Sequence, residues 1–230
     1  MLTIIKKNLY GEQREKILVM LTSDLDKRIL EISYKNKLSH LGSCFSSVGI
    51  IDEIYTKMKP DDIFILSAGH SALALYVCLE KHRNKNAEQL FLKHGGHPHR
   101  EEKDSIHCST GSLGMGICVA LGRAIADPNR KVYVMISDGE CAEGSVWESL
   151  KTISEQKIEN IDVYVNINGY AAYMEIDQQY LSDRLKTFLP RIHLRYTTVE
   201  RFPFLHGLNA HYHVMSKEDY ETGLRLLENR

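Results

Sequence analysis

Two stretches of sequence decide the fold: Val132-Tyr-Val-Met-Ile-Ser-Asp-Gly-Glu-Cys-Ala-Glu-Gly-Ser-Val-Trp-Glu148 and Ile161-Asp-Val-Tyr-Val-Asn-Ile-Asn-Gly-Tyr170. Each begins with a short apolar run that contains β-branched residues, and each run ends in small polar residues. The segment between the two runs is helix-like. A strand, a helix and a second strand in this order predict a βαβ unit. The chain is therefore expected to be an α/β protein with a parallel sheet.

Asp138 and Asn168 follow the two predicted strands. Parallel strands bring their carboxyl ends to one edge of the sheet, where α/β proteins bind ligands, so we expect the two side chains to meet. A carboxylate and an amide carbonyl are hard oxygen ligands that suit Mg²⁺ or Ca²⁺. A Mg²⁺ site with so few protein ligands normally shares its ion with waters and substrate phosphates. Gly139 lets the backbone approach such a ligand closely.

The pair Asp138-Gly, followed by Asn168-Gly, resembles the diphosphate-binding signature of thiamine diphosphate enzymes. An Asp-Gly pair alone is usually a turn, but here a strand precedes it, a helix follows it and the Asn ends the next strand. The fuller string over 138–148 is similar to the transketolase family, in the split form whose amino-terminal half is a separate subunit. The resemblance implies the parallel-sheet thiamine diphosphate-binding fold (PP-type domain) with helices on both faces, as a single domain over residues 1–230.

The composition excludes several classes of protein. The 230 residues carry 29 basic and 30 acidic side chains, so no broad attraction to nucleic acid or an anionic membrane is indicated. A short apolar run precedes the first lysines and no long apolar segment follows, so we expect neither signal peptide nor membrane span. The cysteines are odd in number and lack Cys-x-x-Cys pairing, which predicts reduced thiols in a cytoplasmic protein. They are Cys44, Cys78, Cys108, Cys118 and Cys141.

Hydrophobic periodicity predicts the other elements. Apolar residues at helical spacing indicate an amphipathic helix from about residue 12 to residue 36. Turn and capping residues place the later boundaries. The expected elements are helices over 48–55, from 71 and over 120–125, a buried strand at 63–66, a helix at 177–189, a strand at 192–199, a loop at 201–213 and a terminal helix from 216 to 227.

Two histidines stand at expected helix entrances. His40, in Ser39-His-Leu-Gly-Ser43, equally fits a turn residue followed by a capping serine. His70 follows the strand at 63–66 and precedes a helix, a place where anions bind near exposed N–H groups. A lone histidine there is more often structural. The resemblance implies that His40 lines the substrate funnel and that His70 contacts the cofactor diphosphate and the substrate.

The loop Lys93-His-Gly-Gly-His-Pro-His-Arg100 contains three histidines. Metal binding is one interpretation, but zinc sites need a defined Cys and His spacing with more distant partners, which the cysteines do not supply. The loop resembles the Gly-His-Pro loop of transketolases, which implies that His97 lies over the reacting carbon. His99 stands where the family usually has an acidic residue, and we expect this departure to affect which sugar is accepted.

Cys108-Ser-Thr-Gly-Ser-Leu-Gly-Met-Gly116 is a glycine-rich run before a helix of small residues. Its glycine spacing differs from the dinucleotide-binding fingerprint, and no clear strand precedes it. It matches the Thr-Gly-x-Leu-Gly-x-Gly run of transketolases, which packs on the thiazolium and diphosphate. The resemblance therefore implies cofactor contacts from Gly111, Ser112, Leu113 and Gly114.

The resemblance thins after Tyr170. A segment with aromatic-Gly-Trp and Asp-Gly-His is missing before the last strand, and Glu200-Arg201 replaces the Lys-Gly pair that the family would have there. His211 falls near the family's late active-site histidine, across an alignment gap. A catalytic role for His211 is expected on that basis.

The resemblance also implies a mechanism. In a transketolase, thiamine diphosphate carries a two-carbon ketol unit from a ketose to an aldose, while the protein places the cofactor and moves protons. The implied ligands of the divalent cation are Asp138, Asn168 and the carbonyl of Tyr170, with Gly139 and Glu140 beside the cofactor. Neutral histidines suit proton transfer on sugar hydroxyls. Those implied here are His40, His70, His97 and His211.

The family's pyrimidine-binding domain, which carries the Glu that activates the cofactor, and its carboxyl-terminal domain have no counterpart in the 230 residues. We therefore expect activity only with a separate carboxyl-half subunit, as a heterotetramer (a dimer of heterodimers), on sugars or sugar phosphates. Glu143 falls at the family's subunit-contact position, or is simply a carboxylate favoured by the helix dipole.

Two alternatives stay open. The first is a subunit of another thiamine diphosphate enzyme, similar to deoxyxylulose-phosphate synthase or a 2-oxo acid dehydrogenase. The second is a non-catalytic remnant of the fold that binds a partner or a metal. The histidine loops at 70 and 97 favour sugar chemistry, whereas the altered tail keeps the remnant in consideration.

Overall fold

A computed structural model describes residues 23–171 and 174–228 of the chain. In this part of the chain four parallel strands form one sheet, in the order β1-β2-β3-β4. Short apolar runs that are buried on both sides are typical of a parallel sheet with helices on each face. The strands are β1 (Ile63–Leu66), β2 (Val132–Ser137), β3 (Ile161–Ile167) and β4 (His193–Tyr196).

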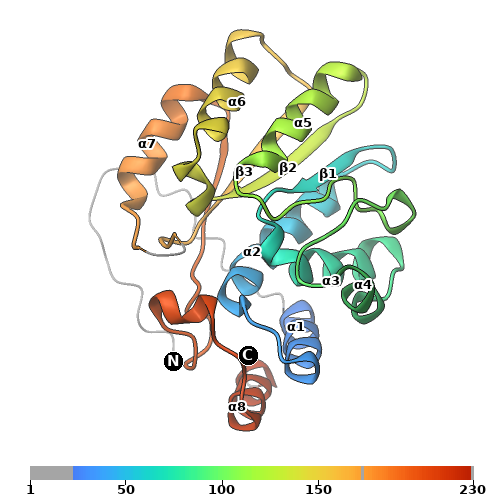
Figure 1. Cartoon of the computed structure of the whole chain (residues 1–230), viewed down its shortest axis with the longest axis vertical. Helices are drawn as coiled ribbons and strands as arrows, with labels where there is room; N and C mark the ends of the chain where they lie inside the picture. The colour runs from blue at the N-terminus through green and yellow to red at the C-terminus, as the bar shows by residue number, and fades with distance from the viewer. Residues whose placement is uncertain (1–22, 172–173, 229–230) are drawn as a thin grey trace.

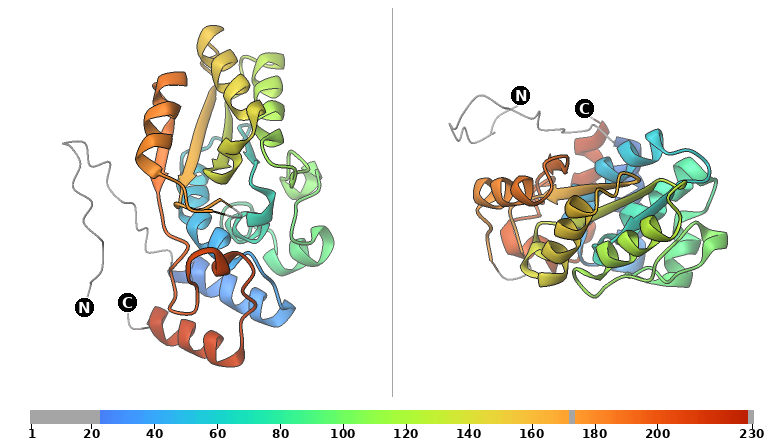
Figure 2. Two further views of the ribbon diagram at one scale, coloured as in Figure 1. Left: turned by 60° about the vertical axis from the view of Figure 1, so that its left-hand side comes forward. Right: turned by 90° about the horizontal axis from the view of Figure 1, so that it is seen from above.

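Helices cover both faces of this sheet, as Figures 1 and 2 show. One face carries α5 (Met115–Ala126), α6 (Gly144–Glu155) and α7 (Gln178–Phe188). The other face carries α2 (Leu41–Lys57) and α3 (Ala72–Arg83), and α1 (Ser23–Asn36) packs against these two helices. On this second side α4 (Ala87–His94) packs against α3, and α8 (Lys217–Glu228) packs against α1.

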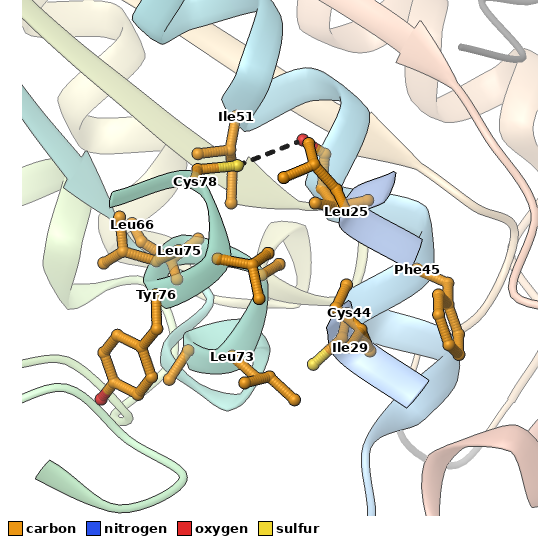
Figure 3. Close-up of a cluster of buried hydrophobic side chains, with 14 of the residues drawn as sticks. Leu25, Ile29, Cys44, Phe45, Ile51, Leu66, Leu73, Leu75, Tyr76 and Cys78 are labelled. Carbon is orange, nitrogen blue, oxygen red and sulfur yellow. Dashed lines mark hydrogen bonds between the residues drawn. The ribbon is translucent and has the colours of Figure 1, made fainter. Parts of the chain in front are cut away.

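Side chains along each strand alternate between two hydrophobic cores, because successive residues of a strand point to opposite faces. Phe64 and Tyr133 join the core formed with α1, α2 and α3. Ile65 and Val134 join the core under α5, α6 and α7. Figure 3 shows part of the first core, where it labels Ile29 of α1, Phe45 of α2 and Leu75 of α3.

Short helical turns connect the strand ends to the helices. The turn η1 (Gly69–Ser71) follows β1, and η3 (Gly139–Ala142) follows β2. Two further turns are η2 (Glu102–Asp104) and η4 (Gly207–His211). Since β1, β2 and β3 run parallel, the residues that follow their carboxyl ends, among them His70, Asp138 and Asn168, lie at one edge of the sheet.

The expected parallel α/β fold with helices on both faces is confirmed. The last strand is shorter than expected, and the segment expected as a loop at 201–213 contains η4. The helix α4 was not expected, and Lys93 and His94 belong to it rather than to a loop. The part of the first expected helix before residue 23 lies outside the described residues. No helix within 23–171 and 174–228 is long and apolar enough to cross a bilayer.

Candidate active site

A cavity of about 220 Å³ lies at the carboxyl ends of the strands. It is bordered by the entrance of α2, by η1, by the loop after α4 and by η4. The residues that the sequence singled out and that line it are His40, His70, His97, Gly111, Leu113, Gly139, Asn168, Tyr170 and His211. The fold therefore brings most of the predicted site residues to one place.

Asp138 lies between two cavity-lining residues, and only 1% of its surface is exposed. Its Oδ2 atom accepts the backbone N–H groups of Asn168 at 2.8 Å and Gly169 at 2.7 Å, and its Oδ1 atom accepts that of Gly139 at 3.0 Å. Burial raises the pKa of the carboxyl to about 7, although the three N–H donors oppose the shift. These bonds confirm that the ends of β2 and β3 meet; the ligand role of Asp138 stays a prediction.

The oxygen atoms near Asp138 have the chemistry that a divalent cation prefers. The side-chain oxygen of Asn168 accepts the N–H of Tyr170 at 3.0 Å. The Tyr170 carbonyl lies 3.8 Å from the position that a Cβ atom would take at Gly139. Among the described residues no group of three or more His, Cys, Asp or Glu side chains is arranged to hold a metal ion. A cation here would therefore use one carboxylate together with amide and carbonyl oxygens, and it would compensate a buried charge.

His40 is placed by the backbone that enters α2. It has a left-handed conformation, with φ 62°, and its N–H donates to the carbonyl of His211 at 2.8 Å. Its Nδ1 atom lies 2.9 Å from the hydroxyl of Ser39. The side chain of His40 does not cap α2; it faces the cavity instead. Of the two interpretations of His40, the plain turn residue and the site residue, its position favours the second.

The four cavity histidines lie close together. The ring centroid of His40 is 4.3 Å from that of His211, 5.9 Å from that of His70 and 6.3 Å from that of His97. Burial, with a smaller contribution from the neighbouring imidazoles, lowers the pKa of His70 to about 3 and that of His40 to about 4. Burial also lowers the pKa of His211. The rings of His40 and His70 are therefore neutral at pH 7, where they can accept or share protons.

The loop that carries His97 is fixed at its start. His94, the last residue of α4, is buried, and its Nε2 atom lies 2.8 Å from a carboxylate oxygen of Asp104. On the other side of His97, a Cβ atom at Gly111 would lie 3.0 Å from the imidazole Cδ2 atom. Glycine at position 111 therefore lets the glycine-rich run pack against the His97 ring.

Besides Asp138, three residues with a predicted cofactor contact do not line the cavity. Ser112 is exposed, whereas Gly114 and Glu140 are buried. The Glu140 carboxylate accepts the N–H groups of Gly114 and Ser137, each at 2.9 Å. A cofactor contact from these three residues stays a prediction.

Sequence reasoning missed part of the wall. The missed lining residues are Ser43, Ser137, Ala171, Val199, Gly207 and Ala210. Val199 and Ala210 pack on the start of α2, where a Cβ atom at Gly42 would lie 3.0 Å and 2.9 Å from their Cβ atoms. No periodic pattern marks such a contact between distant segments, although two small residues at 42 and 210 are compatible with it.

The unusual pair Glu200-Arg201 anchors this tail. Arg201 forms an ion pair with Asp26 of α1, whose side chain is fully buried. Glu200 accepts the backbone N–H of Gly207 at 3.0 Å. Glu200 and Arg201 therefore hold the segment that leads to η4 and His211.

The family model described as "Transketolase, thiamine diphosphate binding domain" matches residues 43–189, well over half of the 230 residues. The chain belongs to the transketolase family. The matched region of this transketolase-family chain includes His70, His97, Asp138 and Asn168, whereas His40 and His211 lie outside it.

Relatives of this transketolase-family chain include one subunit of the apulose-4-phosphate transketolase of Phocaeicola vulgatus, which is 32% identical over 162 residues, 62% of this chain and 57% of that protein. The transketolase of Homo sapiens is 36% identical over 150 residues, 56% of this chain and 24% of that protein. The 1-deoxy-D-xylulose-5-phosphate synthase of Fusobacterium nucleatum is 30% identical over 150 residues, 63% and 24% respectively. The chain thus spans about half the length of the apulose-4-phosphate transketolase subunit and about a quarter of the other two proteins.

Solved transketolases share the fold. The enzyme from Campylobacter jejuni superposes with a TM-score of 0.69 at 17% identity, covering 93% of this chain and 43% of that one. The enzyme from Leishmania mexicana gives a TM-score of 0.67 at 18% identity, covering 90% and 41%. At these identities the likeness bears on the fold alone, and it confirms the fold expected from the sequence.

Proposed function

We propose that this chain is the thiamine diphosphate-binding half of a transketolase, which transfers a two-carbon ketol unit between sugars. The observation that carries the proposal is the meeting of Asp138 with the Asn168-Gly169 backbone, at 2.8 and 2.7 Å, beside a cavity lined by four histidines. A buried carboxylate next to amide and carbonyl oxygens suits the cation of a diphosphate. A neutral imidazole cluster suits proton transfer on hydroxyl groups.

The residues divide into two groups. Asp138, Asn168 and the Tyr170 carbonyl would hold Mg²⁺ or Ca²⁺ for the diphosphate, and the glycine-rich run and Leu113 would contact the cofactor. When bound, thiamine diphosphate supplies the carbanion chemistry that breaks and forms the carbon–carbon bond. The histidines hold the sugar and move protons at its hydroxyl oxygens. They are His40, His70, His97 and His211.

The other half of the active site comes from a second polypeptide. We propose a carboxyl-half subunit that supplies the pyrimidine-binding domain and the activating Glu, in a dimer of heterodimers. Two relatives are themselves named as single subunits of a transketolase, and this chain covers about half of each, which supports a divided enzyme. Glu143, which is exposed at the start of α6, fits the partner contact.

The substrates are sugars or sugar phosphates, and the compartment is the cytoplasm. Two relatives are named for apulose-4-phosphate, which supports a phosphorylated sugar as one substrate. The five cysteines are all free, as expected in a reducing compartment. The chain is also similar to a 1-deoxy-D-xylulose-5-phosphate synthase, but the relatives named as transketolase subunits favour transketolase chemistry over that alternative. An assay with a ketose donor and an aldose acceptor, run beside one with pyruvate, separates the two.

Calorimetry tests the proposal. Thiamine diphosphate with Mg²⁺ is titrated into the chain alone and into the chain mixed with the product of the neighbouring gene. We expect the mixture to bind thiamine diphosphate, and we expect ketol transfer only in the mixture. The variant D138A should lose cation-dependent binding, whereas the exposed control E155Q should keep it. Absence of binding in both samples, with the chain folded, would favour the non-catalytic remnant.

A further inference from the structure

Glu140 is a fully buried carboxylate two positions after Asp138; it does not line the cavity, and its side chain lies among a set of hydrogen-bond donors. Its Oε1 atom accepts the hydroxyl of Ser67 at 2.6 Å and the N–H of Gly114 at 2.9 Å. Its Oε2 atom accepts the N–H of Ser137 at 2.9 Å and lies 3.5 Å from the hydroxyl of the same residue. One side chain thus joins the end of β1, the end of β2 and the glycine-rich run.

Gly114 is held from two sides. Its N–H is bound to Glu140, and its carbonyl accepts the hydroxyl of Ser145 at 3.0 Å. Its φ is 75°, and a Cβ atom there would lie 2.5 Å from the Ser145 hydroxyl oxygen and 2.7 Å from the Glu143 Cβ atom. This peptide group therefore has little freedom, and it fixes the neighbouring residue Leu113, which lines the cavity.

Burying a carboxylate is costly unless donors replace its water. Within the described residues Glu140 forms no ion pair, and the donors come from Ser67, Gly114 and Ser137. Each Glu140 oxygen accepts a backbone N–H, so a glutamine at this position would place its NH₂ group against one of these N–H donors. Both terminal atoms of the side chain must therefore be acceptors, and among side chains of this length only the carboxylate of Glu meets that requirement.

We propose that Glu140 is a positioning residue: it locks the run from Gly111 to Gly114 onto the ends of β1 and β2, so that Gly111 and Leu113 present a rigid wall to the cofactor. It acts through the loop and does not touch the cofactor. The proposal rests on the proposed function for the identity of the ligand. Its structural part, the hold on Gly114, is independent of that function.

Amide hydrogen exchange of the cofactor-free chain tests the hold directly. In E140Q the exchange rate of the Gly114 amide should rise about tenfold or more, because its acceptor is lost or mispaired. Amides in β3 should exchange as in the wild type. The exposed variant E155Q is the matched control and should change neither. Fluorescence of Trp147, whose indole N–H donates to the Cys141 carbonyl at 2.9 Å, reports whether the turn after Asp138 is intact.

Cofactor binding gives the second readout. In the complex with the partner subunit, E140Q should raise the KM for thiamine diphosphate about tenfold while kcat changes less than about twofold, the pattern of weakened binding with intact chemistry. If E140Q fails to fold, S67A replaces it. This variant removes one donor and adds none, so a smaller change in the same direction is expected.

The outcomes separate the two proposals. Unchanged exchange at Gly114 in folded E140Q, or in S67A when E140Q does not fold, would overturn the positioning role. Loss of cofactor binding with unchanged exchange would make Glu140 a direct ligand and would also overturn it. A wild-type chain that binds no thiamine diphosphate, alone or with its partner, would contradict the proposed function, while the exchange result would still decide the role of Glu140.

Discussion

The imidazole of His211 stands edge-on against the imidazole of His40, with ring centroids 4.3 Å apart and an angle of 71° between the planes. The backbone supports this contact, since the His40 N–H donates to the His211 carbonyl at 2.8 Å. His40 precedes α2 and His211 ends η4, so the contact joins the tail to the start of α2. The tail is therefore a wall of the cavity, even though it lies beyond the residues that the family model matches.

Replacing His211 with Ala should reduce ketol transfer without unfolding the chain. The bond from His40 uses the backbone carbonyl of His211, which the substitution leaves in place. Loss of a group that transfers protons typically costs about a hundredfold or more in rate. Steady-state kinetics of the complex measures the effect. The exposed His206 supplies the control, and H206A should have wild-type activity. Equal activity of both variants would remove His211 from the catalytic group.

The variant G42A should destabilise the chain and disturb the cavity. The new Cβ atom would lie 2.9 Å from that of Ala210 and 3.0 Å from that of Val199, so the tail or α2 must move. Overpacking of this kind costs about 1–3 kcal/mol. Urea denaturation measures the free energy of unfolding.

A second glycine provides the control for that experiment. Gly122 lies on the exposed side of α5, and a Cβ atom there would meet nothing within 4 Å. Alanine is favoured over glycine inside a helix by about 0.5–1 kcal/mol, so G122A should stabilise the chain. A G42A variant as stable as G122A would show that the tail does not pack as described.

Local patterns were sufficient to predict the sheet and the centre of the site. The apolar runs that form β2 and β3 end in Asp138 and Asn168, and parallel strands necessarily bring their carboxyl ends to one edge. The place of His70 at the same edge follows likewise from the buried strand before it, whereas its role rests on the resemblance to the family. These inferences need only residues that are near each other in sequence.

The tail and α4 show where local patterns were insufficient. The contact of Gly42 with Ala210 depends on tertiary packing, which no period in the sequence encodes. The helix α4 did have a local signal, since Asn86 caps it by accepting the N–H of Gln89 at 2.9 Å. The helix is short, and the glycines and histidines that follow it predicted a loop that began at Lys93. The resemblance implies that Glu140 lies beside the cofactor, whereas its carboxylate accepts the N–H of Gly114.

The variant H70Q should make stability less dependent on pH between 5 and 7. The pKa of His70 is about 3 in the folded chain and close to 6.5 when unfolded. The unfolded chain therefore takes up a proton that the folded chain does not, and stability is lost as pH falls below 6.5. Urea denaturation at pH 7 and pH 5 measures the free energy of unfolding. Its decrease from pH 7 to pH 5 should be about 1–2 kcal/mol larger for the wild type than for H70Q. The exposed variant H206Q should behave as the wild type; a loss in H70Q as large as in the wild type would contradict the neutral state of His70.

The variant E53Q should weaken the attachment of α2 to β4. It should also remove part of the loss of stability that the chain shows at acid pH. Both Glu53 oxygens accept Arg195 N–H groups at 2.8 Å, Lys57 adds a further ion pair, and together they lower the pKa of Glu53 to about 2.

The pKa of the Glu53 carboxyl is lowered in the folded chain. Its contribution to the free energy of unfolding is therefore complete above about pH 4.5 and is lost as the pH falls toward 2. At pH 7 the loss of the charged pair should cost E53Q about 1–3 kcal/mol in the free energy of unfolding. E155Q, which breaks only an exposed pair with Lys151, should change it by less than about 0.5 kcal/mol. Because His40 directly precedes α2, a shift of α2 against β4 would also move His40 relative to the strand ends. An E53Q variant that loses stability but keeps full activity would show that the start of α2 is held by the tail alone.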